Sequence, residues 1–573
     1  MRINTVERIT GLTPKAIRLY ESKGLLRVAR EENGYRNYTE EDVIVLKKIK
    51  LLRSVGVSIA DIKLYLFGVV NIEELMDQRK TEIMKESGIH SEMYRICENI
   101  AQNDHYYEND SNDVFNENEE IVTEDSGEVV VGIDLGTTTI SAVVYDLRRK
   151  VQLESYTLAH NSYVVSNVFS EQNTAVIIEK AEKLLYHIIK CYSNVVSIGV
   201  TGQMHGIVYI DEDGKAVSNL INWQDKRADL VLESGKTTVE LIAQLTDEAV
   251  ATGYGIATHY YNRCKNLVPA DAVGFCSIMD YFGMRLCGKK TAVMHASVAA
   301  SLGLFDVQKG CFMLEKLAHL GIDASFLPMV TRKNEMVGEC RGIPVSVALG
   351  DNQASFLGSV DNNEDSVLVN IGTGSQISAV SEYCPVAAGI EIRPFLEGNY
   401  LICGSSLCGG SAYETLERFF RSFAVSAGLQ DVPQYKTLNA LAWEAYQNGE
   451  RGLKIDTSFC GKRTEPSCRG FIEGISMQNF TPSALIIGVL NGILEELYQL
   501  YRLFPCKKNR VIASGGGIRK NKVLQKILEE KTGMPVAINQ VTEEAATGAA
   551  LFSALATGKI AYCNGFSEYI NYD

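Results

Sequence analysis

Two different spacings of hydrophobic and polar positions divide the chain near residue 129. Before that point, apolar residues recur at helical spacing, as in VIVLKKIKLL at 43–52 and IKLYLF at 62–67. After it, short apolar runs such as VVVGI at 129–133 and VLVNI at 367–371 predict buried strands. We therefore expect a helical amino-terminal part followed by a larger α/β part. No apolar run reaches the roughly 18 residues of a membrane span, so no membrane segment is expected.

The first 70 residues carry dense signals for helix starts and turns. Thr13-Pro14 marks the start of a helix, because threonine caps it and proline fits its first turn. Asn33-Gly34 predicts a tight hairpin whose return strand holds residues 35–38. Two short helices, a β-ribbon and two further helices make a winged helix-turn-helix.

This segment resembles the DNA-binding domain of MerR-type transcription regulators, through ITGLTPKAIRLYESKGLL and ENGYRNYTEEDVIVLKKIKLLRSVGVSIADI. The resemblance covers about residues 1–70 and implies that the helix beginning near Thr13 enters the major groove of promoter DNA. It implies base or phosphate contacts from this helix and backbone contacts from the wing, by Lys15, Arg18 and Tyr20 and by Arg36 and Tyr38 respectively. The alternative is that Arg18 and Arg36 are merely solvated surface charges.

Charge is distributed unevenly along the chain. The net charge is −14, which argues against a protein that coats DNA uniformly. Residues 1–70 nevertheless hold 13 Lys and Arg against 8 Asp and Glu, whereas residues 104–128 hold 10 Asp and Glu and no Lys or Arg. We interpret 104–128 as an acidic flexible linker, because it is polar and lacks helical periodicity. A role as a DNA mimic is the alternative.

Residues 71–103 predict one further helix, capped by Asn71. Ile89, Met93, Ile96 and Ile100 follow the 4-3-4 spacing of a short coiled-coil seam. In the MerR family such a helix pairs with its copy, so the resemblance implies a homodimer. The alternative is a helix that packs on its own domain. Because Cys97 is the only cysteine near this helix, we do not expect metal sensing.

Two similar polar turns follow the buried strands of the α/β part. Asp134 ends the first strand, and the turn Gly136-Thr137-Thr138-Thr139 follows it. The turn Gly372-Thr373-Gly374 repeats the pattern about 236 residues later, which indicates a duplicated fold with two phosphate-binding hairpins. Glycine and hydroxyl groups at such tips bring several donors to one point, as phosphate binding requires.

Two further segments complete the candidate chemistry. Gly515, Gly516 and Gly517 precede a helical pattern, where backbone can approach a nucleotide closely. Asp351 follows a strand in VSVALGDNQ and starts a helix, so its carboxylate is placed to take a proton from a hydroxyl. A plain helix cap is the alternative for Asp351.

The motifs DLGTTT, GDNQ, NIGTGS and SGGG, in this order, resemble the FGGY carbohydrate kinases of the actin-like ATPase superfamily. The resemblance covers about 129–560 and implies ATP and Mg²⁺ as cofactors. It makes Asp351 the general base and Asp134 and Asp351 the residues at the metal. It implies that the two hairpins clamp the phosphates and that the third glycine turn, with Asn521, holds adenosine.

A second set of motifs narrows the resemblance to sedoheptulokinase-type members. These motifs are TGQMHG at 201–206, NWQDKR at 222–227 and TGYG at 252–255. Sugar recognition needs convergent polar groups, and the candidates for it are Gln203, Met204, His205, Trp223, Asp225 and Arg227. A core imidazole is the alternative for His205, and a structural pair with Asp225 is the alternative for Arg227.

We therefore expect an α/β protein with a two-lobed, actin-like ATPase fold of the duplicated ribonuclease H-like kind. A winged helix-turn-helix domain (1–70), a dimerisation helix (71–103) and a linker (104–128) precede lobes at 129–360 and 361–573. The predicted function is an ATP-dependent ketose or polyol kinase that also binds promoter DNA. The alternative is a transcription regulator whose kinase-like region senses sugar or nucleotide with little turnover. Without a signal peptide and with fourteen scattered cysteines, we expect a cytoplasmic protein with reduced thiols.

Overall fold

A computed structural model describes the chain from residue 1 to residue 572, apart from some short segments and most of the predicted linker. These are residues 27, 31–34, 88–91, 103–126, 167–168, 386–388, 463–464 and 466. The described residues form two compact units. The first comprises Met1–Asp125 with Glu182–Ser193 and Ala424–Pro433, and the second comprises the remainder.

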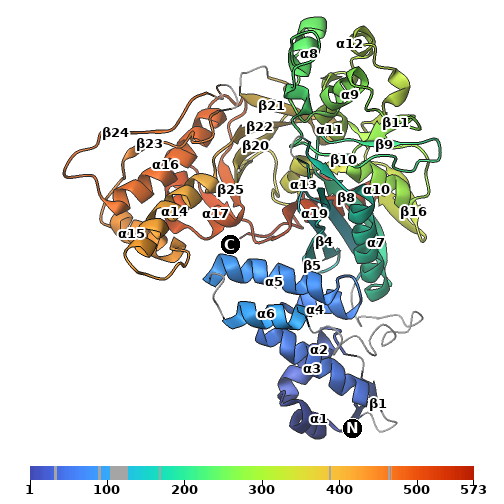
Figure 1. The fold of residues 1–573 in the computed structure, drawn as a ribbon, viewed down its shortest axis with the longest axis vertical. Coiled ribbons are helices and arrows are strands. Elements are labelled where there is room, and N and C mark those ends of the chain that lie inside the picture. Colours follow the sequence, from blue (N-terminus) through green and yellow to red (C-terminus); the bar gives the residue numbers. More distant parts are fainter. Residues whose placement is uncertain are drawn as a thin grey trace. The chain divides into compact units, whose positions relative to one another are not determined.

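The amino-terminal module has the predicted order of elements (Figure 1): α1 (Ile3–Thr10), α2 (Pro14–Ser22), β1 (Ala29–Arg30), β2 (Arg36–Asn37), α3 (Glu40–Ser54) and α4 (Ile59–Leu66). The Thr13 side chain accepts the Ala16 amide at 3.2 Å and so caps α2. Thr39 and Asp42 form a reciprocal capping box at the start of α3. Strands β1 and β2 pair antiparallel and form the wing.

The predicted single helix over 71–103 is two helices, α5 (Ile72–Ser87) and α6 (Glu92–Gln102), which pack against one another. Asn71 caps α5 as predicted, since its side-chain oxygen accepts the Glu74 amide at 2.8 Å. Helix α5 ends at Ser87, and the next residue in the sequence is glycine, which has a low helix propensity. Ile89 of the expected seam lies outside the described residues, and Ile100 is buried. Helix α6 therefore has a partner within its own chain.

A seven-stranded sheet forms the first half of the α/β region. Its order is β16 (Met336–Cys340), β17 (Ile343–Ser346), β8 (Val195–Gly202), β3 (Val129–Leu135), β4 (Thr139–Asp146) and β5 (Val151–Ala159), and β18 (Leu349–Gly350) also pairs with β8. Strand β3 pairs antiparallel with β4 and parallel with β8.

A six-stranded sheet forms the second half. Its order is β21 (Ile390–Pro394), β22 (Tyr400–Ser406), β20 (Ser375–Ser381), β19 (Ser366–Ile371), β25 (Arg510–Ser514) and β26 (Val536–Ile538). Strand β19 pairs antiparallel with β20 and parallel with β25, as β3 does with β4 and β8. This shared pattern supports the predicted duplication.

Two helices connect the sheets, α13 (Asp351–Leu357) and α19 (Glu544–Ala556). Figure 1 shows them between the two sheets. A Cβ atom at Gly358 or Gly548 would collide with backbone of the facing helix, so glycine permits their close crossing. Helix α19 also packs on β3 and β8. A helix from the predicted second lobe thus covers strands of the first, because its small residues fit Gly132 and Gly199.

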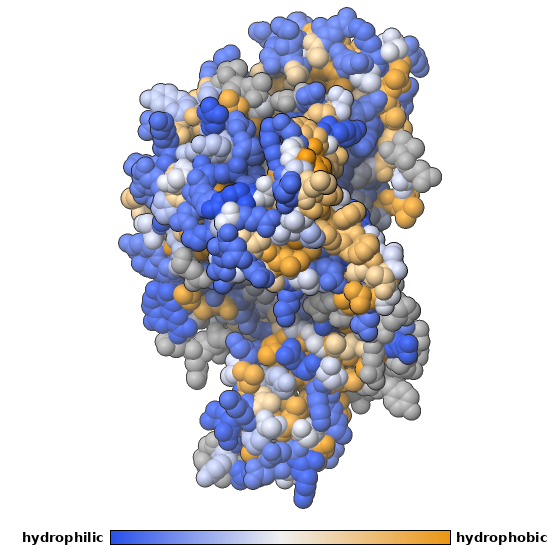
Figure 2. Space-filling model, turned by 90° about the vertical axis from the view of Figure 1, so that its left-hand side faces the viewer, coloured by the Kyte–Doolittle hydropathy of each residue, from blue (hydrophilic) through white to orange (hydrophobic). Residues whose placement is uncertain are grey.

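The outer face of the second sheet is covered by α15 (Tyr435–Gln447), α16 (Pro482–Tyr501) and α18 (Lys522–Thr532), beside α14 (Gly410–Ser426). Among the described residues, α16 alone is long and apolar enough to cross a membrane. Its buried residues pack against β20 and β22, as in a core helix. In the view of Figure 2 most of the surface is hydrophilic, and apolar residues gather in a band at its middle.

The following helices and strands also belong to the α/β region. They are α7 (Thr174–Cys191), α8 (Thr238–Thr246), α9 (Gly255–Cys264), α10 (Ile278–Leu286), α11 (Ala296–Ala299), α12 (Leu314–His319), α17 (Gly516–Arg519), β6 (Tyr163–Val164), β7 (Glu171–Gln172), β9 (Val208–Ile210), β10 (Leu220–Ile221), β11 (Gly274–Cys276), β12 (Val293–His295), β13 (Phe305–Asp306), β14 (Cys311–Phe312), β15 (Met329–Thr331), β23 (Lys454–Asp456) and β24 (Phe471–Glu473).

Candidate functional site

The first polar turn is the tip of the β3–β4 hairpin. Asp134 pairs with Ser141 and Leu135 with Ile140, so the turn between them carries the predicted glycine and threonines. Thr137 lies near the sugar-site candidates, because its side-chain oxygen accepts the indole N–H of Trp223 at 3.0 Å. Thr138 is exposed at the tip. This arrangement leaves hydroxyl and amide groups available to an anion.

The second polar turn is the tip of the β19–β20 hairpin, closed by the pairing of Ile371 with Ser375. The amide of Gly372 donates to the carbonyl of Gly374 at 3.0 Å. A segment that sequence reasoning missed supports this turn: Gly410, the first residue of α14, donates to the carbonyl of Gly372 at 2.8 Å. A Cβ atom at the neighbouring Gly409 would collide with Gly374. In the sequence, only the glycine pair at 409–410 marked the segment that supports the turn.

A cavity of about 280 Å³ brings the two hairpins and the predicted base together. Its lining includes Asp134, Gly136 and Thr137 of the first hairpin and Asp351 of α13. It also includes Gln203, a candidate for the sugar site. The other lining residues flank the second hairpin or were missed by sequence reasoning, namely Asn352, Ser355, Leu368, Asn370, Gln376 and Ala545. The predicted carboxylates therefore share one crevice with the first polar turn and with strand residues of the second hairpin.

The cavity is electrostatically negative around Asp134. Burial raises the pKa of Asp134 to about 7, and the negative charges of Asp351 and Glu543 add to the shift. Glu543 is held in place by Thr157, whose hydroxyl donates to it at 2.7 Å. A divalent cation beside these carboxylates would relieve their repulsion. Oxygen ligands of this kind suit Mg²⁺, which uses one or two carboxylates together with water and phosphate oxygens.

Asp351 begins α13 and accepts a hydrogen bond from the Asn352 amide at 2.6 Å. Burial raises the pKa of Asp351 above its ordinary value, and the positive charge of Arg393 opposes the shift. Arg393 lies on β21, is 8% exposed and forms an ion pair with Glu391. Sequence reasoning missed Arg393, because only the pairing of β21 with β22 brings it to this site.

The third glycine turn begins α17 beside the second hairpin. A Cβ atom at Gly515 would lie 2.5 Å from the Ile371 carbonyl oxygen, and one at Gly516 would meet no atom within 4 Å. The side chain of Asn370 donates to Ser514 at 2.9 Å. The backbone of 515–517 thus follows the hairpin closely and keeps an open side at Gly516.

Asn521 has a structural role in addition to the one predicted for it. Its side-chain oxygen accepts the Leu524 amide at 3.0 Å and caps α18. Its side-chain nitrogen donates to Asn439 of α15 at 3.1 Å. A contact between Asn521 and adenosine stays a prediction.

The six sugar-site candidates fall into three pairs, of which the first lies beside the first polar turn. Gln203 lines the cavity, donates to the Gly136 carbonyl at 3.2 Å and to Gln172 at 2.9 Å, and keeps a buried side-chain oxygen without a partner among the described residues. Trp223 is 46% exposed and bonded to Thr137. These two side chains are available to a polyol beside the phosphate loop.

His205 and Met204 both make contacts with other residues of the protein. His205 adopts a positive φ of 73°, contacts the Ser301 carbonyl at 2.7 Å and stacks on Tyr254 at 4.6 Å. Met204 is 2% exposed, and its sulfur lies 3.8 Å from both the Asn352 amide and Arg393. Direct sugar contacts by these two residues stay predictions.

Asp225 and Arg227 are a correction to the predicted sugar site. They form a buried ion pair at 2.8 Å, and Arg227 also bonds to Glu171 at 2.7 Å. Asp225 additionally accepts the Ser170 amide at 2.8 Å. Because their polar atoms are occupied by the protein itself, the structural alternative describes this pair.

Some of the predicted DNA-binding residues are exposed and others are buried. Lys15 and Arg18 are exposed on α2, while Arg36 on the wing forms an ion pair with Glu21. Tyr20 and Tyr38 are 8% and 1% exposed. These two tyrosines belong to the hydrophobic core of the module, which corrects the prediction that they contact DNA.

Three family models match consecutive parts of the chain. Residues 1–67 match the MerR HTH family regulatory protein. Residues 129–358 match the FGGY family of carbohydrate kinases, N-terminal domain, and residues 368–557 match the C-terminal domain of that family. The two FGGY matches together span well over half of the chain.

Similar proteins agree with these matches. The chain is 28% identical over 473 residues to sedoheptulokinase from Mus musculus, covering 74% of this chain and 96% of the mouse protein. It is 25% identical over 452 residues to xylulose kinase from Staphylococcus xylosus, covering 74% of this chain and 90% of that protein.

Solved structures show the same fold. Gluconate kinase from Lactobacillus acidophilus superimposes with a TM-score of 0.68 at 17% identity, covering 78% of this chain and 92% of that one. Xylulose kinase from the same organism gives 0.66 at 18% identity, with the same coverage. The α/β region has the actin-like ATPase fold that its sequence motifs predicted.

Proposed function

The chain belongs to the FGGY family of carbohydrate kinases and carries a MerR-type helix-turn-helix domain, and we propose that it phosphorylates a ketose or polyol with ATP. The substrate we favour is a sugar of the sedoheptulose or xylulose kind, because proteins with these activities resemble it over most of their length. The observation that carries the proposal is the single cavity that Asp351 shares with Asp134 and the first phosphate hairpin.

Asp351 is the general base of the proposed reaction. Its carboxylate takes the proton of a sugar hydroxyl while that oxygen attacks the terminal phosphorus of ATP. The bond between that phosphorus and the bridging oxygen breaks, and ADP leaves. The Arg393 charge supports this role because it favours the ionised carboxylate despite burial.

The polar turns supply the positioning on which phosphoryl transfer depends. We assign the terminal phosphates to Thr137, Thr138 and Thr139 with Gly136 and to Gly372, Thr373 and Gly374. We assign adenosine to the turn Gly515, Gly516 and Gly517. Support comes from the hydrogen bonds that hold the second hairpin against the start of α14 and from the open side of Gly516.

Asp134 and Asp351 would hold Mg²⁺, and the raised pKa of Asp134 supports a cation there. When bound, the metal neutralises charge on the phosphate oxygens. Gln203 and Trp223 would orient the sugar, since a buried amide oxygen and an indole face suit hydroxyl and C–H groups respectively.

Coupled ADP release tests the kinase proposal over sedoheptulose, xylulose, ribulose, glycerol and gluconate. We expect turnover with a ketose and a loss of about 10²- to 10⁴-fold in Asp351→Asn, the usual contribution of a general base. Asp213→Asn is the matched control, because Asp213 is an exposed surface residue paired with Lys290. The absence of sugar-dependent ADP release by the wild type would contradict the proposal.

We also propose that the amino-terminal module binds promoter DNA and regulates sugar-utilisation genes, as a homodimer. Ligand binding can change DNA affinity only if sugar and ATP bind the DNA-competent state with a different affinity. An operator selected from a random DNA library provides the probe. Equal operator affinity with and without sugar plus ATP would contradict regulation by the kinase ligands.

A further inference from the structure

Two cysteines that are distant in sequence meet behind the second phosphate hairpin. Cys408 follows β22 and is 1% exposed, whereas Cys460 lies on an exposed turn after β23. The Cys460 amide donates to the Cys408 sulfur at 3.3 Å, so the backbone of the turn that carries Cys460 contacts the Cys408 side chain. All fourteen cysteines are unbridged in this structure.

The turn that carries Cys460 is held in position next to Cys408. Asp456 accepts the Ser458 amide at 2.8 Å and forms an ion pair with Lys462 at 3.1 Å, so both ends of the turn are tied to one carboxylate. A Cβ atom at Gly492 of α16 would meet Thr457, which shows how closely the strand before the turn packs. The contact between the Cys460 backbone and the Cys408 sulfur is therefore built into the fold.

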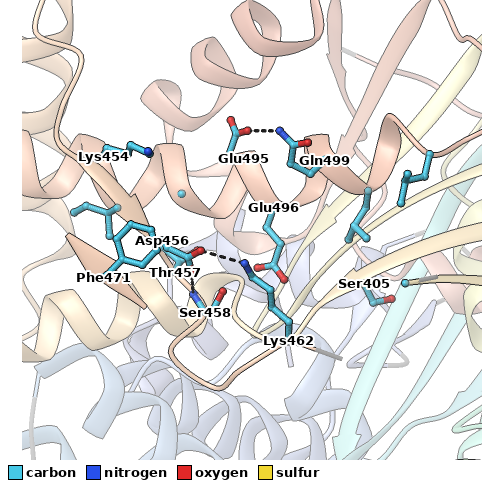
Figure 3. Close-up of a pocket in the computed structure, with 15 residues that line it drawn as sticks. Ser405, Lys454, Asp456, Thr457, Ser458, Lys462, Phe471, Glu495, Glu496 and Gln499 are labelled. Atoms are coloured by element: carbon cyan, nitrogen blue, oxygen red, sulfur yellow. Dashed lines mark hydrogen bonds and ion pairs between the residues drawn. The ribbon is translucent and has the colours of Figure 1, made fainter. Parts of the chain in front are cut away.

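A second cavity gives solvent a route to this region. It measures about 400 Å³ and lies between α16 and the chain around β23 (Figure 3). Ser458 and Lys462, which flank Cys460 in sequence, both line it, together with Glu496. Figure 3 shows the side chain of Lys462 reaching toward Asp456 along this cavity. Small polar molecules can reach the exposed turn that carries Cys460.

Cys408 is joined directly to the backbone that supports the hairpin. The amides of Gly409, Gly410 and Ser411 donate to the carbonyls of Gly372 and Thr373. There is no room for even a methyl group between Gly409 and Gly374. Any displacement of Cys408 is therefore passed to the turn Gly372-Thr373-Gly374.

We propose that Cys408 and Cys460 form a reversible disulfide when the protein meets a peroxide. The Cys460 thiolate attacks one peroxide oxygen, the O–O bond breaks, and Cys460 becomes a sulfenic acid as the first water is released. The Cys408 thiol then attacks that sulfur, the S–O bond breaks, and the second water leaves with the Cys408 proton. The two thiols lose two electrons and two protons in total, and hydrogen peroxide is reduced to two waters.

The difference in burial between the two thiols sets the order of these steps. Burial raises the pKa of the Cys408 thiol, so it remains protonated and out of reach of the oxidant. Cys460 is exposed and meets the oxidant first. Cys408 then resolves the sulfenic acid, because it already touches the same turn.

The consequence for catalysis rests on the proposed function. A disulfide holds its sulfurs about 2.05 Å apart, closer than any non-bonded contact, so Cys408 must move toward Cys460. We expect this shift to raise the KM for ATP by about tenfold, since displacements of this size at phosphate-positioning groups are costly. Dithiothreitol should restore the original value.

Peptide mass mapping of the full-length protein tests the disulfide itself. After treatment with hydrogen peroxide and alkylation, we expect a cross-linked peptide pair containing Cys408 and Cys460 in the wild type. It should be absent from Cys460→Ser, an exposed substitution that keeps the fold. Cys468→Ser on the same loop is the matched control and should still form the pair. Alkylation of both Cys408 and Cys460 in peroxide-treated wild type would overturn the proposal.

Kinase assays separate this proposal from the proposed function. Before oxidation, wild type and Cys460→Ser should have the same KM for ATP. After peroxide, only the wild type and Cys468→Ser should show the reversible increase. If the cross-link forms but no sugar is phosphorylated by untreated protein, the kinase proposal fails and the disulfide stands. If the cross-link forms and the KM for ATP is unchanged, its proposed effect on the hairpin is wrong.

Discussion

Asp134 and Asp351 have the same functional group and share one cavity, yet their surroundings differ. Asp134 faces the negative charges of Asp351 and Glu543, which add to the effect of burial on its pKa. Asp351 has the positive charge of Arg393 nearby and a hydrogen bond from Asn352. These surroundings suit a cation ligand in the first case and a proton acceptor in the second.

Substitution of Gly515 tests whether the turn that we assign to the nucleotide requires glycine at this position. Gly515 has a φ of 90°, which side-chain-bearing residues rarely adopt, and an added Cβ would lie 2.5 Å from the Ile371 carbonyl oxygen. We expect Gly515→Ala to lower the free energy of unfolding by about 1–3 kcal/mol and to raise the KM for ATP. Denaturant titration and steady-state kinetics measure the two effects.

Gly516→Ala is the matched control for Gly515→Ala. A Cβ atom at Gly516 meets no atom within 4 Å, so its free energy of unfolding should equal that of the wild type. Equal stability of the two alanine variants would show that the turn at 515 can relax and that close packing against Ile371 is unimportant.

At the scale of elements, the two hairpins repeat one arrangement, in which a strand pairs antiparallel with the next and parallel with a third. The parallel partners, β8 and β25, end beside the hairpin tips and lead to Gln203 and Gly515 respectively. Each hairpin is therefore supported by a segment distant in sequence. In the amino-terminal unit, α2 is positioned by its own residues. Its N-cap fixes its start, and the buried side chain of Ile17 holds it in the module.

The exposed face of α2 provides a prediction for DNA binding. Arg18→Ala should weaken binding to the selected operator and lower the slope of log affinity against log salt by about one, the value for one lost phosphate contact. Fluorescence anisotropy over a salt series measures both. Lys47→Ala removes the same charge from the exposed side of α3 and is the matched control. Equal losses in the two variants would point to non-specific attraction instead of docking by α2.

At the scale of the whole molecule, the two halves of the kinase region are joined through α13 and α19. The helices cross at Gly358 and Gly548, and α19 lies on strands of the first sheet at Gly132 and Gly199. Helices α13 and α19, which come late in the first and second half respectively, thus pack into one continuous core. Stability of this region should consequently depend on groups buried far from the catalytic cavity.

Buried histidines make the kinase region sensitive to acid. Burial lowers the pKa of His295 to about 4 and that of His259 to about 4. An unfolded histidine titrates near pH 6.5, so between about pH 6.5 and 4 the unfolded chain binds protons that the folded chain does not. Each such histidine should therefore lower the free energy of unfolding by about 1.4 kcal/mol per pH unit as the pH falls through that range. Asp134, whose pKa burial raises to about 7, contributes in the opposite direction, so the histidine effect is measured as a difference between variants.

Urea titrations at pH 7, 6 and 5 measure this effect. Both tryptophans, Trp223 and Trp443, belong to the kinase region, so intrinsic fluorescence follows its unfolding. His295→Gln should reduce the slope of the free energy of unfolding against pH by up to the contribution of one histidine. His319→Gln, which changes an exposed side chain, should leave this slope unchanged. The same pH dependence in His295→Gln and in the wild type would contradict the prediction.

Features that depend on neighbouring residues were predictable from the sequence, whereas features that depend on tertiary contacts were not. Helix caps such as Thr13 and Asn71, the hairpin tips and the start of α13 at Asp351 were predictable, because each depends on neighbours within a few residues. The break between α5 and α6 was underestimated, since helical spacing continues on both sides of Gly88. The burial of Tyr38 was missed because its aromatic ring also suits a DNA contact.

The sequence by itself determined the order of domains, the two polar turns and the candidate for the base, since these follow from local conformational preferences and motif order. Only the tertiary structure decided which charges surround that base and which predicted sugar ligands are already occupied. Arg393, Glu543 and the Asp225–Arg227 pair acquire their roles through strand register and helix packing. Electrostatic interactions depend on distance in space, and the spacing of residues along the chain does not contain that distance.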